Sequence, residues 1–165
     1  MSHKNQPTAI AFRKHDHRRC QRQLLSAARE VCELRQLRLT RRRRQVLEIL
    51  LDSHQPMGAY DILAELNRRH ATEQIAPPIV YRALEFLLGQ GLVHRIESKN
   101  AFISCVHPGH QAGAQFLICR DCERVAELEH KDPGLIAEAD NLGFSIDHSV
   151  VEITGVCAAC QKNGR

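Results

Sequence analysis

Apolar residues recur every three or four positions in four stretches of the chain, which is the pattern of amphipathic helices packed on a core. These stretches cover residues 24–36, 41–54, 59–70 and 77–91. Thr40 stands at the N-cap position of the second stretch, and Pro77 and Pro78 suit the first turn of the fourth. Residues 1–23 have no clear apolar period, so we expect a flexible basic arm there.

The period changes to two in residues 92–105, where apolar positions flank the polar turn Glu97–Asn100 and predict a two-stranded hairpin. Short helices followed by a hairpin are the element order of a winged helix-turn-helix, which we expect in residues 24–104. The helix before the hairpin is then the recognition helix, and Tyr81 and Arg82 lie near its N-terminal end, where side chains reach base edges. The alternative interpretation is an ordinary α-helical domain with a surface Tyr and Arg.

A polar segment rich in Gly, Pro and His follows, and residues 105–114 are the expected hinge between two domains. The rest of the chain, residues 115–165, alternates strand and helix patterns. Strands are predicted over 115–119, 124–129 and 145–154, and a helix over 133–142. The sequence therefore predicts an α+β protein whose small C-terminal α/β domain needs a metal or a second copy of itself to bury enough surface.

Charge is distributed unevenly along the 165 residues. Residues 1–44 hold 13 Lys and Arg against 3 Asp and Glu, whereas residues 45–165 hold 10 against 16. A basic part of this kind suits a polyanion, although a solvated charged tail has the same composition. Four arginines crowd the positive end of the second helix, which is unfavourable without an anion, and we expect them to bind DNA: Arg41, Arg42, Arg43 and Arg44.

Seven cysteines in a chain without an export signal or a membrane-length apolar run favour a cytoplasmic protein with reduced thiols. Four of them form two C-x-x-C pairs, the ligand set of a closed zinc site: Cys119, Cys122, Cys157 and Cys160. The rival is a thioredoxin-like redox pair, which needs a helix directly after the motif. A strand pattern follows Cys122 instead, so we predict a structural zinc. Four protein ligands leave no position for a substrate, and we expect no enzyme activity.

Four further candidate ligands come from both sides of the expected hinge: His94, Cys105, His110 and Glu127. A single His is more often an ordinary polar residue than a ligand, but this set combines two nitrogens, one sulfur and one oxygen. The thiolate favours zinc over iron or manganese. Such a site links metal affinity to domain orientation, as in a sensor. His107 can replace or supplement His110, and spacing alone does not choose between them.

Five segments resemble the ferric uptake regulator superfamily, most closely its zinc uptake regulator branch: RLTRRRRQVLEIL, AYDILAEL, PPIVYRALEFLLGQGLVHRIES, FLICRDCERVAELE and GVCAAC. The resemblance implies a homodimeric winged-helix repressor of zinc uptake genes, which binds an AT-rich inverted repeat of double-stranded DNA when zinc is plentiful. It also implies two zinc ions per subunit. The paired cysteines match the structural ligands of the family, the set around the hinge matches the regulatory ligands, and Tyr81 and Arg82 match its base contacts.

The chain departs from this family pattern at several positions. Ile79 stands where the family carries Ser or Thr, which removes one expected phosphate contact or helix cap. The His-rich run of the family is shortened here, which argues against a third metal site that uses His148. The arm with His15, His17 and Cys20 lies outside the match, and we expect disorder there, with metal capture or phosphate binding as the alternatives. The nearest alternative function is an iron-, manganese- or peroxide-responsive regulator. A thiol redox protein or a zinc buffer is a more distant one.

Overall fold

The computed structural model describes residues 10–109, 114–128, 133–147 and 149–163. The chain folds into two compact units, one of residues 14–110 and the other of residues 111–165 together with residues 1–13. No helix within the described ranges is both long and apolar enough to cross a membrane.

The first helix of the larger unit, α1 (His17–Leu34), starts well before Leu24, where the apolar pattern predicted it to begin. Asp16 is the N-cap, and its carboxylate accepts a backbone N–H bond from the first turn at 3.1 Å. Cys20 then extends the buried stripe of the helix by one step toward the N-terminus. Helix α1 therefore occupies part of the stretch predicted as a flexible arm, residues 1–23, because one cap and one buried cysteine add about two helical turns.

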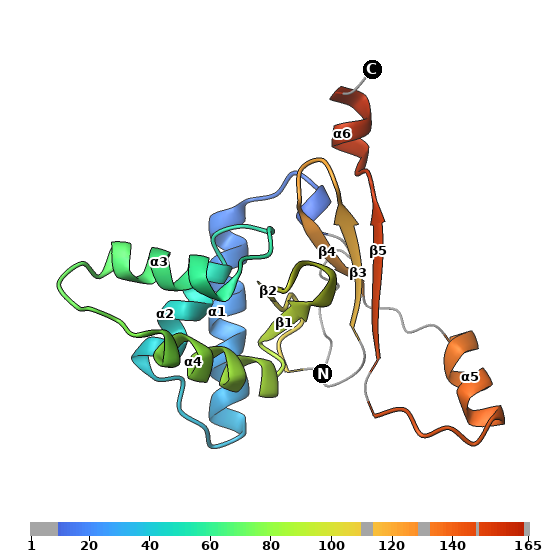
Figure 1. Cartoon of the computed structure of the whole chain (residues 1–165), viewed down its shortest axis with the longest axis horizontal. Coiled ribbons are helices and arrows are strands. Elements are labelled where there is room, and N and C mark those ends of the chain that lie inside the picture. Colours follow the sequence, from blue (N-terminus) through green and yellow to red (C-terminus); the bar gives the residue numbers. More distant parts are fainter. Residues whose placement is uncertain (1–9, 110–113, 129–132, 148, 164–165) are drawn as a thin grey trace. The chain divides into compact units, whose positions relative to one another are not determined.

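Three more helices follow in the same unit (Figure 1): α2 (Arg41–Leu50), α3 (Ala59–Arg69) and α4 (Pro77–Gly89). Their apolar stripes meet in one core, whose fully buried side chains include Val46, Ile62, Leu66, Val80 and Leu87. The sequence predicted these three helices because each has clear start and stop signals. Thr40 is the N-cap of α2 as predicted, but among the described residues its side chain makes no capping hydrogen bond.

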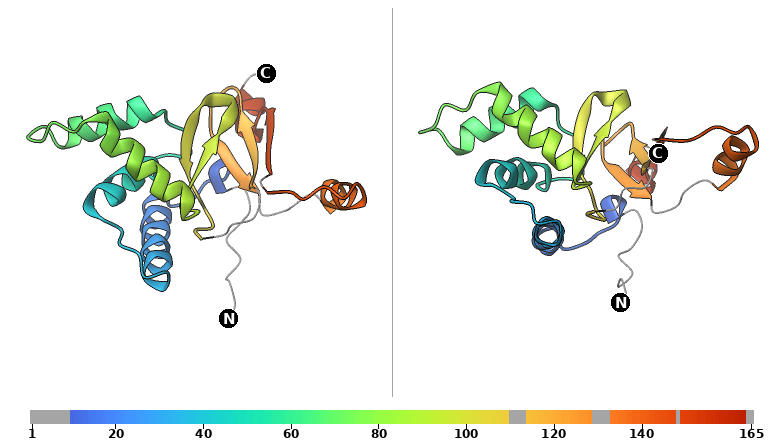
Figure 2. Two further views of the ribbon diagram at one scale, coloured as in Figure 1. Left: turned by 60° about the horizontal axis from the view of Figure 1, so that its bottom comes forward. Right: turned by 90° about the horizontal axis from the view of Figure 1, so that it is seen from below.

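Arg35 joins the end of α1 to the end of α4. One guanidinium nitrogen donates to the backbone carbonyl of Gln90 at 2.9 Å and to its side-chain oxygen at 3.0 Å, and another donates to the Gly109 carbonyl at 2.8 Å. Gly109 has a φ of +91°, and a Cβ there would come within 2.9 Å of Val31. These charge-assisted bonds fix α1 to the other helices, and Figure 2 shows α1 beside α2 in two further views.

The hairpin predicted after α4 is present, and its strands β1 (Val93–Ile96) and β2 (Ala101–Ser104) pair antiparallel along their full length. Asn100 closes the turn in the left-handed conformation with a φ of +47°. Met57 and Phe102 exchange two backbone hydrogen bonds of 2.8 and 2.9 Å, so the loop before α3 adds a bridge to the hairpin. The unit is thus a winged helix-turn-helix with one additional N-terminal helix.

The smaller unit is built on a three-stranded sheet of order β4-β3-β5, with β3 (Ala114–Cys119) in the centre (Figure 1). β4 (Val125–Leu128) pairs antiparallel with β3, and β5 (Val150–Gly155) pairs parallel with it. Parallel neighbours need a crossover connection, and α5 (Pro133–Asn141) lies in that connection. The α+β architecture predicted from the sequence is confirmed.

One strand in this unit begins later than predicted, and two short elements are new. β5 begins at Val150 and not at Ser145, because residues 142–147 are exposed and have no core face to pair against. A short helix, α6 (Ala158–Asn163), follows β5, and its six residues are too few to show an apolar period. A 3-10 turn, η1 (Ile10–Phe12), has a buried central alanine that packs near β4.

Candidate functional site

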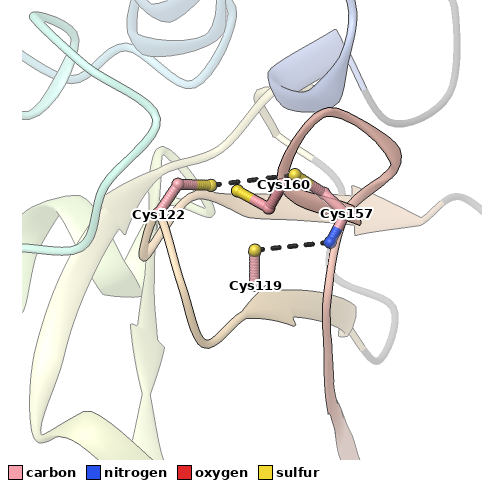
Figure 3. A group of neighbouring side chains, drawn as sticks. All are labelled: Cys119, Cys122, Cys157 and Cys160. Atoms are coloured by element: carbon pink, nitrogen blue, oxygen red, sulfur yellow. Dashed lines mark hydrogen bonds between the residues drawn. The ribbon is translucent and has the colours of Figure 1, made fainter. Parts of the chain in front are cut away.

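The four paired cysteines meet at one end of the sheet in the smaller unit (Figure 3). The parallel register of β3 and β5 sets Cys119 opposite Gly155, and the N–H of Arg120 donates to the Gly155 carbonyl at 2.9 Å. Just beyond the end of β5, the backbone N–H of Cys157 donates to Cys119 Sγ at 3.3 Å. Parallel pairing therefore brings the two C-x-x-C motifs together, although they are far apart in the sequence.

Each motif also turns its second cysteine back toward the first. After Cys119 the chain reverses sharply, because the Glu123 N–H donates to the Cys119 carbonyl at 2.9 Å and the Cys119 N–H donates to the Arg124 carbonyl at 3.0 Å. Glu123 takes a φ of +59°, the left-handed conformation that this reversal requires. In the second motif, Cys160 lies in α6, three positions after Cys157, so that about one helical turn returns it to the side of Cys157.

The sulfur positions fit a tetrahedral zinc ion. All four Sγ atoms lie within 4.8 Å of one another, and those of Cys122 and Cys157 are 3.8 Å apart. Zinc–sulfur bonds of about 2.3 Å at tetrahedral angles place neighbouring sulfurs about 3.8 Å apart. Cys122 leads into strand β4 and not into a helix, unlike a thioredoxin-type pair. Donor type, number and spacing are therefore those of a closed structural zinc site.

The protonation of the thiols also favours a bound cation. Backbone N–H groups of Cys122 and Cys157 lower the pKa of Cys119 to about 6. The hydrogen bond with Cys157 raises the pKa of Cys160 to about 12, and burial raises the pKa of Cys122. The backbone thus stabilises one thiolate, whereas the neighbouring thiols resist further negative charge. A divalent cation offsets the repulsion among four thiolates.

Two of the ligands predicted for the second metal set lie on the wing hairpin. His94 is in β1, opposite Ile103, and Cys105 directly follows β2. The Cys105 N–H donates to the Leu92 carbonyl at 3.0 Å, which continues the ladder. Both side chains therefore lie on one face of the hairpin, with their ligand atoms within 4.8 Å of each other. The His107 N–H donates to Cys105 Sγ at 3.3 Å.

The other two members of that set are Glu127 and His110, and of these only Glu127 is among the described residues. Glu127 belongs to the smaller unit, where it is buried on β4 opposite Phe116. A buried carboxylate needs hydrogen bonds or a cation to offset its lost hydration. His110 and His148 lie outside the described residues. The regulatory set as a whole stays a prediction.

Helix α4, the predicted recognition helix, exposes its predicted base-contacting residues to solvent. Tyr81 is 47% exposed and Arg82 is exposed beside it, whereas Val80 and Ala83 are buried. No side chain of the described residues caps the start of this helix, where Ile79 replaces the Ser or Thr of the family pattern. An exposed Tyr and Arg in the N-terminal half of a helix suit contact with base edges in a major groove.

Glu73 pairs with the first two arginines of α2. Arg41 contacts one carboxylate oxygen at 2.8 Å, and Arg42 pairs with the other. The Arg41 side chain stays 66% exposed, whereas that of Arg42 is only 26% exposed. Arg41 is therefore on the surface, where a phosphate can join or replace Glu73. Arg42 is mostly covered and mainly stabilises the fold through its ion pair with Glu73.

Arg43 and Arg44 also differ in how far their side chains are engaged by the fold. The Arg43 guanidinium lies 3.5 Å from the centre of the Phe86 ring and donates to the Arg38 carbonyl at 2.8 Å. Arg44 pairs with Glu48 one turn further along α2 at 2.7 Å and keeps an exposed side chain. Arg41 and Arg44 are thus the stronger phosphate-binding candidates among the predicted four.

The structure also groups three residues that the sequence pattern left apart. His15, Cys20 and His54 each offer a ligand atom, and these atoms all lie within 4.8 Å of one another. The early start of α1 creates this group, because the Asp16 cap turns Cys20 inward beside the loop that follows α2. The Asp16 cap is a sequence signal for the inward position of Cys20, but nothing in the local sequence relates His54 to it.

Comparison with known proteins agrees with this architecture. The sequence profile described as the ferric uptake regulator family matches residues 34–154. The zinc uptake regulation protein of Escherichia coli (strain K12) is 39% identical over 143 residues, which cover 84% of this chain and 81% of that protein. A zinc uptake regulator complexed with zinc and DNA aligns with a TM-score of 0.76 at 36% identity, covering 87% of this chain and 97% of the other. Holo XcZur aligns with a TM-score of 0.76 at 40% identity, covering 86% and 99%. With a family match and a relative of this identity over most of its length, the chain belongs to the ferric uptake regulator family.

Proposed function

We propose that this protein is a zinc-responsive transcriptional repressor, which binds operator DNA as a homodimer when loaded with zinc and controls genes for zinc uptake. The observation that carries this proposal is the His94–Cys105 pair on one face of the wing hairpin, because it puts a thiol and an imidazole directly into the DNA-binding unit. The E. coli zinc uptake regulation protein and the zinc uptake regulator solved with zinc and DNA support the same assignment. Members of the family are regulators and not enzymes.

DNA binding rests on α4 and on the basic charge of the N-terminal part. In this proposal Tyr81 and Arg82 contact base edges in the major groove, and Arg41 and Arg44 contact phosphates. A dimer reads two half-sites with the symmetry of the protein, so an inverted repeat is the expected operator form. Its AT-rich composition follows from the family resemblance.

The four-cysteine site and the dimer support each other in this scheme. Cys119, Cys122, Cys157 and Cys160 hold a structural zinc that joins β3 to the end of β5 and stabilises a unit with a small core. The same unit exposes large apolar side chains, with Leu142 79% and Phe144 65% exposed. A second copy of the chain is the occupant that such a surface suits in a family of dimeric regulators.

The regulatory zinc is a second ion, in addition to the structural one. We assign its ligands to His94, Cys105, His110 and Glu127, a nitrogen, sulfur and oxygen set that favours zinc over iron or manganese. Bound there, zinc supplies a link between residues of the two units. To move the population from 1:99 to 99:1, the ion must bind the DNA-competent arrangement about 10⁴-fold more tightly than the other one. The burial of Glu127 supports this assignment, because a buried carboxylate gains from a nearby cation, and so does the position of Cys105 beside His94.

The experiment is an operator-binding titration against buffered free zinc. A duplex selected from a random library by the zinc-loaded full-length protein serves as operator, and fluorescence anisotropy reports binding. We expect zinc-dependent binding that a chelator reverses. Cys105→Ser should keep the fold and the four-cysteine zinc but lose the response, whereas Cys32→Ser, a buried cysteine of α1, should keep it.

Parallel titrations separate the alternatives. Binding driven by iron(II) or manganese(II) at lower free concentration than zinc, or abolished by peroxide, would replace the zinc assignment with that signal. A zinc-loaded protein with no salt-sensitive, sequence-selective DNA binding would instead favour a thiol redox protein or a zinc buffer.

A further inference from the structure

Three side chains converge at the N-terminal end of α1, within the DNA-binding unit and apart from the structural and regulatory metal sets. His15 precedes the N-cap residue of the helix, Cys20 is buried in its first turns, and His54 comes from the loop after α2. The Nε2 atoms of His15 and His54 are 3.1 Å apart. The Cys20 sulfur completes a group whose three ligand atoms all lie within 4.8 Å of one another.

The surrounding contacts hold this group in place. Asp52, two residues before His54, accepts a bond from His17 Nε2 at its carbonyl (2.8 Å) and one from the Gln21 amide at its carboxylate (3.0 Å). Arg69 at the end of α3 pairs with the same carboxylate. The loop is therefore tied to α1 on one side and to α3 on the other. Such fixed partners reduce the entropy lost when a ligand binds.

The distances suit a metal ion. Zinc–nitrogen bonds of about 2.0–2.1 Å at tetrahedral angles place two ligand nitrogens about 3.4 Å apart. The observed 3.1 Å is close to that value, so the His15 and His54 rings need little movement. In the absence of a cation the two nitrogens at this distance share one hydrogen, and a metal ion takes the position of that hydrogen between them.

The donor set indicates the kind of metal. Two imidazole nitrogens and one thiolate suit zinc, whereas carboxylate-poor sites of this type do not suit magnesium, calcium or manganese. His17 is next to the group, with its ring centre 5.6 Å from that of His15 and 5.1 Å from that of His54. The fourth tetrahedral position is then open to His17 or to water.

We propose that His15, Cys20 and His54 form a zinc site in the DNA-binding unit, separate from the four-cysteine site and from the set around the hinge. The site joins the start of α1 to the loop between α2 and α3. It makes the stability of the winged helix itself depend on zinc, because a ligand that binds only the folded state stabilises it by mass action.

The test counts zinc per chain in the full-length protein by competition with a chromophoric chelator. His54→Ala and Cys20→Ser should each bind one equivalent less than wild type. Two matched variants should keep the wild-type number: His70→Ala, which removes a histidine of the same unit that bonds Gln45, and Cys32→Ser, which alters a buried cysteine further along α1. Equal stoichiometry in all five proteins would overturn the site.

Cobalt(II) spectra and melting temperatures provide a second test in case a variant folds poorly. Cobalt(II) bound to a thiolate gives a sulfur-to-metal charge-transfer band, and Cys20→Ser should lose part of that band while His54→Ala shifts the ligand-field bands. Zinc should raise the melting temperature of wild type more than that of His54→Ala. Identical cobalt spectra and identical zinc-induced shifts contradict the proposal, and capture of copper(I) without any zinc binding at these residues overturns the zinc assignment. The zinc count compares variants with wild type, so its outcome does not depend on the result of the operator-binding experiment.

Discussion

Arg82→Ala is expected to remove sequence discrimination more than general DNA affinity. Arg82 is exposed in the N-terminal half of α4, whose opposite face is buried through Val80, Ala83 and Leu87. A bidentate arginine contact contributes about 1–3 kcal/mol of discrimination at one base pair. A dimer carries two such contacts, so the loss is about 2–6 kcal/mol, which corresponds to at least about a 30-fold weaker operator complex. The fold should be unaffected, because the side chain lies on the surface.

The assay is fluorescence anisotropy with an operator duplex and a scrambled duplex of equal composition, over a range of salt concentrations and at saturating zinc. Arg41→Ala is the matched control. Its side chain is 66% exposed and its ion pair with Glu73 is a surface pair, so its removal costs little stability. As a phosphate contact it should weaken both duplexes alike and reduce the salt slope by about 0.9 per subunit.

The two variants give opposite signatures, which makes the reasoning refutable. Equal weakening of both duplexes by Arg82→Ala would remove this residue from base recognition and place it among the phosphate contacts. A selective loss of operator binding in Arg41→Ala would reverse the assignment of α2. An unchanged operator affinity in Arg82→Ala would show that α4 is not the recognition helix.

Cys119→Ser should lose the structural zinc and the dimer, which zinc content and size-exclusion chromatography report, while Cys32→Ser keeps both; a stable zinc-free dimer would contradict the structural assignment. Ile62→Ala should lower the free energy of unfolding by about 2–5 kcal/mol in urea denaturation, because Ile62 is fully buried among the helices of the first unit, and a loss below about 1 kcal/mol would contradict that packing. The hydrogen bond from Arg68 lowers the pKa of Glu65 from its usual 4.5 to about 2. Ionised Glu65 therefore stabilises the folded state fully above its pKa in the unfolded chain, and this stabilisation is lost as the pH falls toward 2. Glu65→Gln should therefore flatten the acid side of the stability profile, and an unchanged profile would show that the ion pair does not act on folding.

Much of the fold was predictable from local sequence signals. The helices α2, α3 and α4 and the wing hairpin each have an apolar period and recognisable end residues within a short window. The start of α1 was missed because its signal is a single N-cap, Asp16, in a stretch otherwise dominated by charge. Helix α6 was missed because six residues do not complete two turns.

The candidate sites were predictable to unequal degrees. The C-x-x-C motifs carry their own chemistry, and the outward direction of Tyr81 follows from the period of α4. The partners of the arginine run were not predictable, because Glu73 lies on a distant connection that only packing brings to α2. The same holds for His54, which nothing in the local sequence relates to Cys20.

The sequence by itself determined which segments are helices or strands and which residues have metal-binding or DNA-binding chemistry, because periodicity, caps and paired cysteines are set by neighbours along the chain. Only the tertiary structure decided which of these residues meet. The parallel register of β3 and β5 places Cys157 against Cys119, and the packing of α1 against the loop after α2 places Cys20 beside His54. Ligand distances of a few ångströms depend on register and helix packing, which arise from contacts between residues far apart in the sequence.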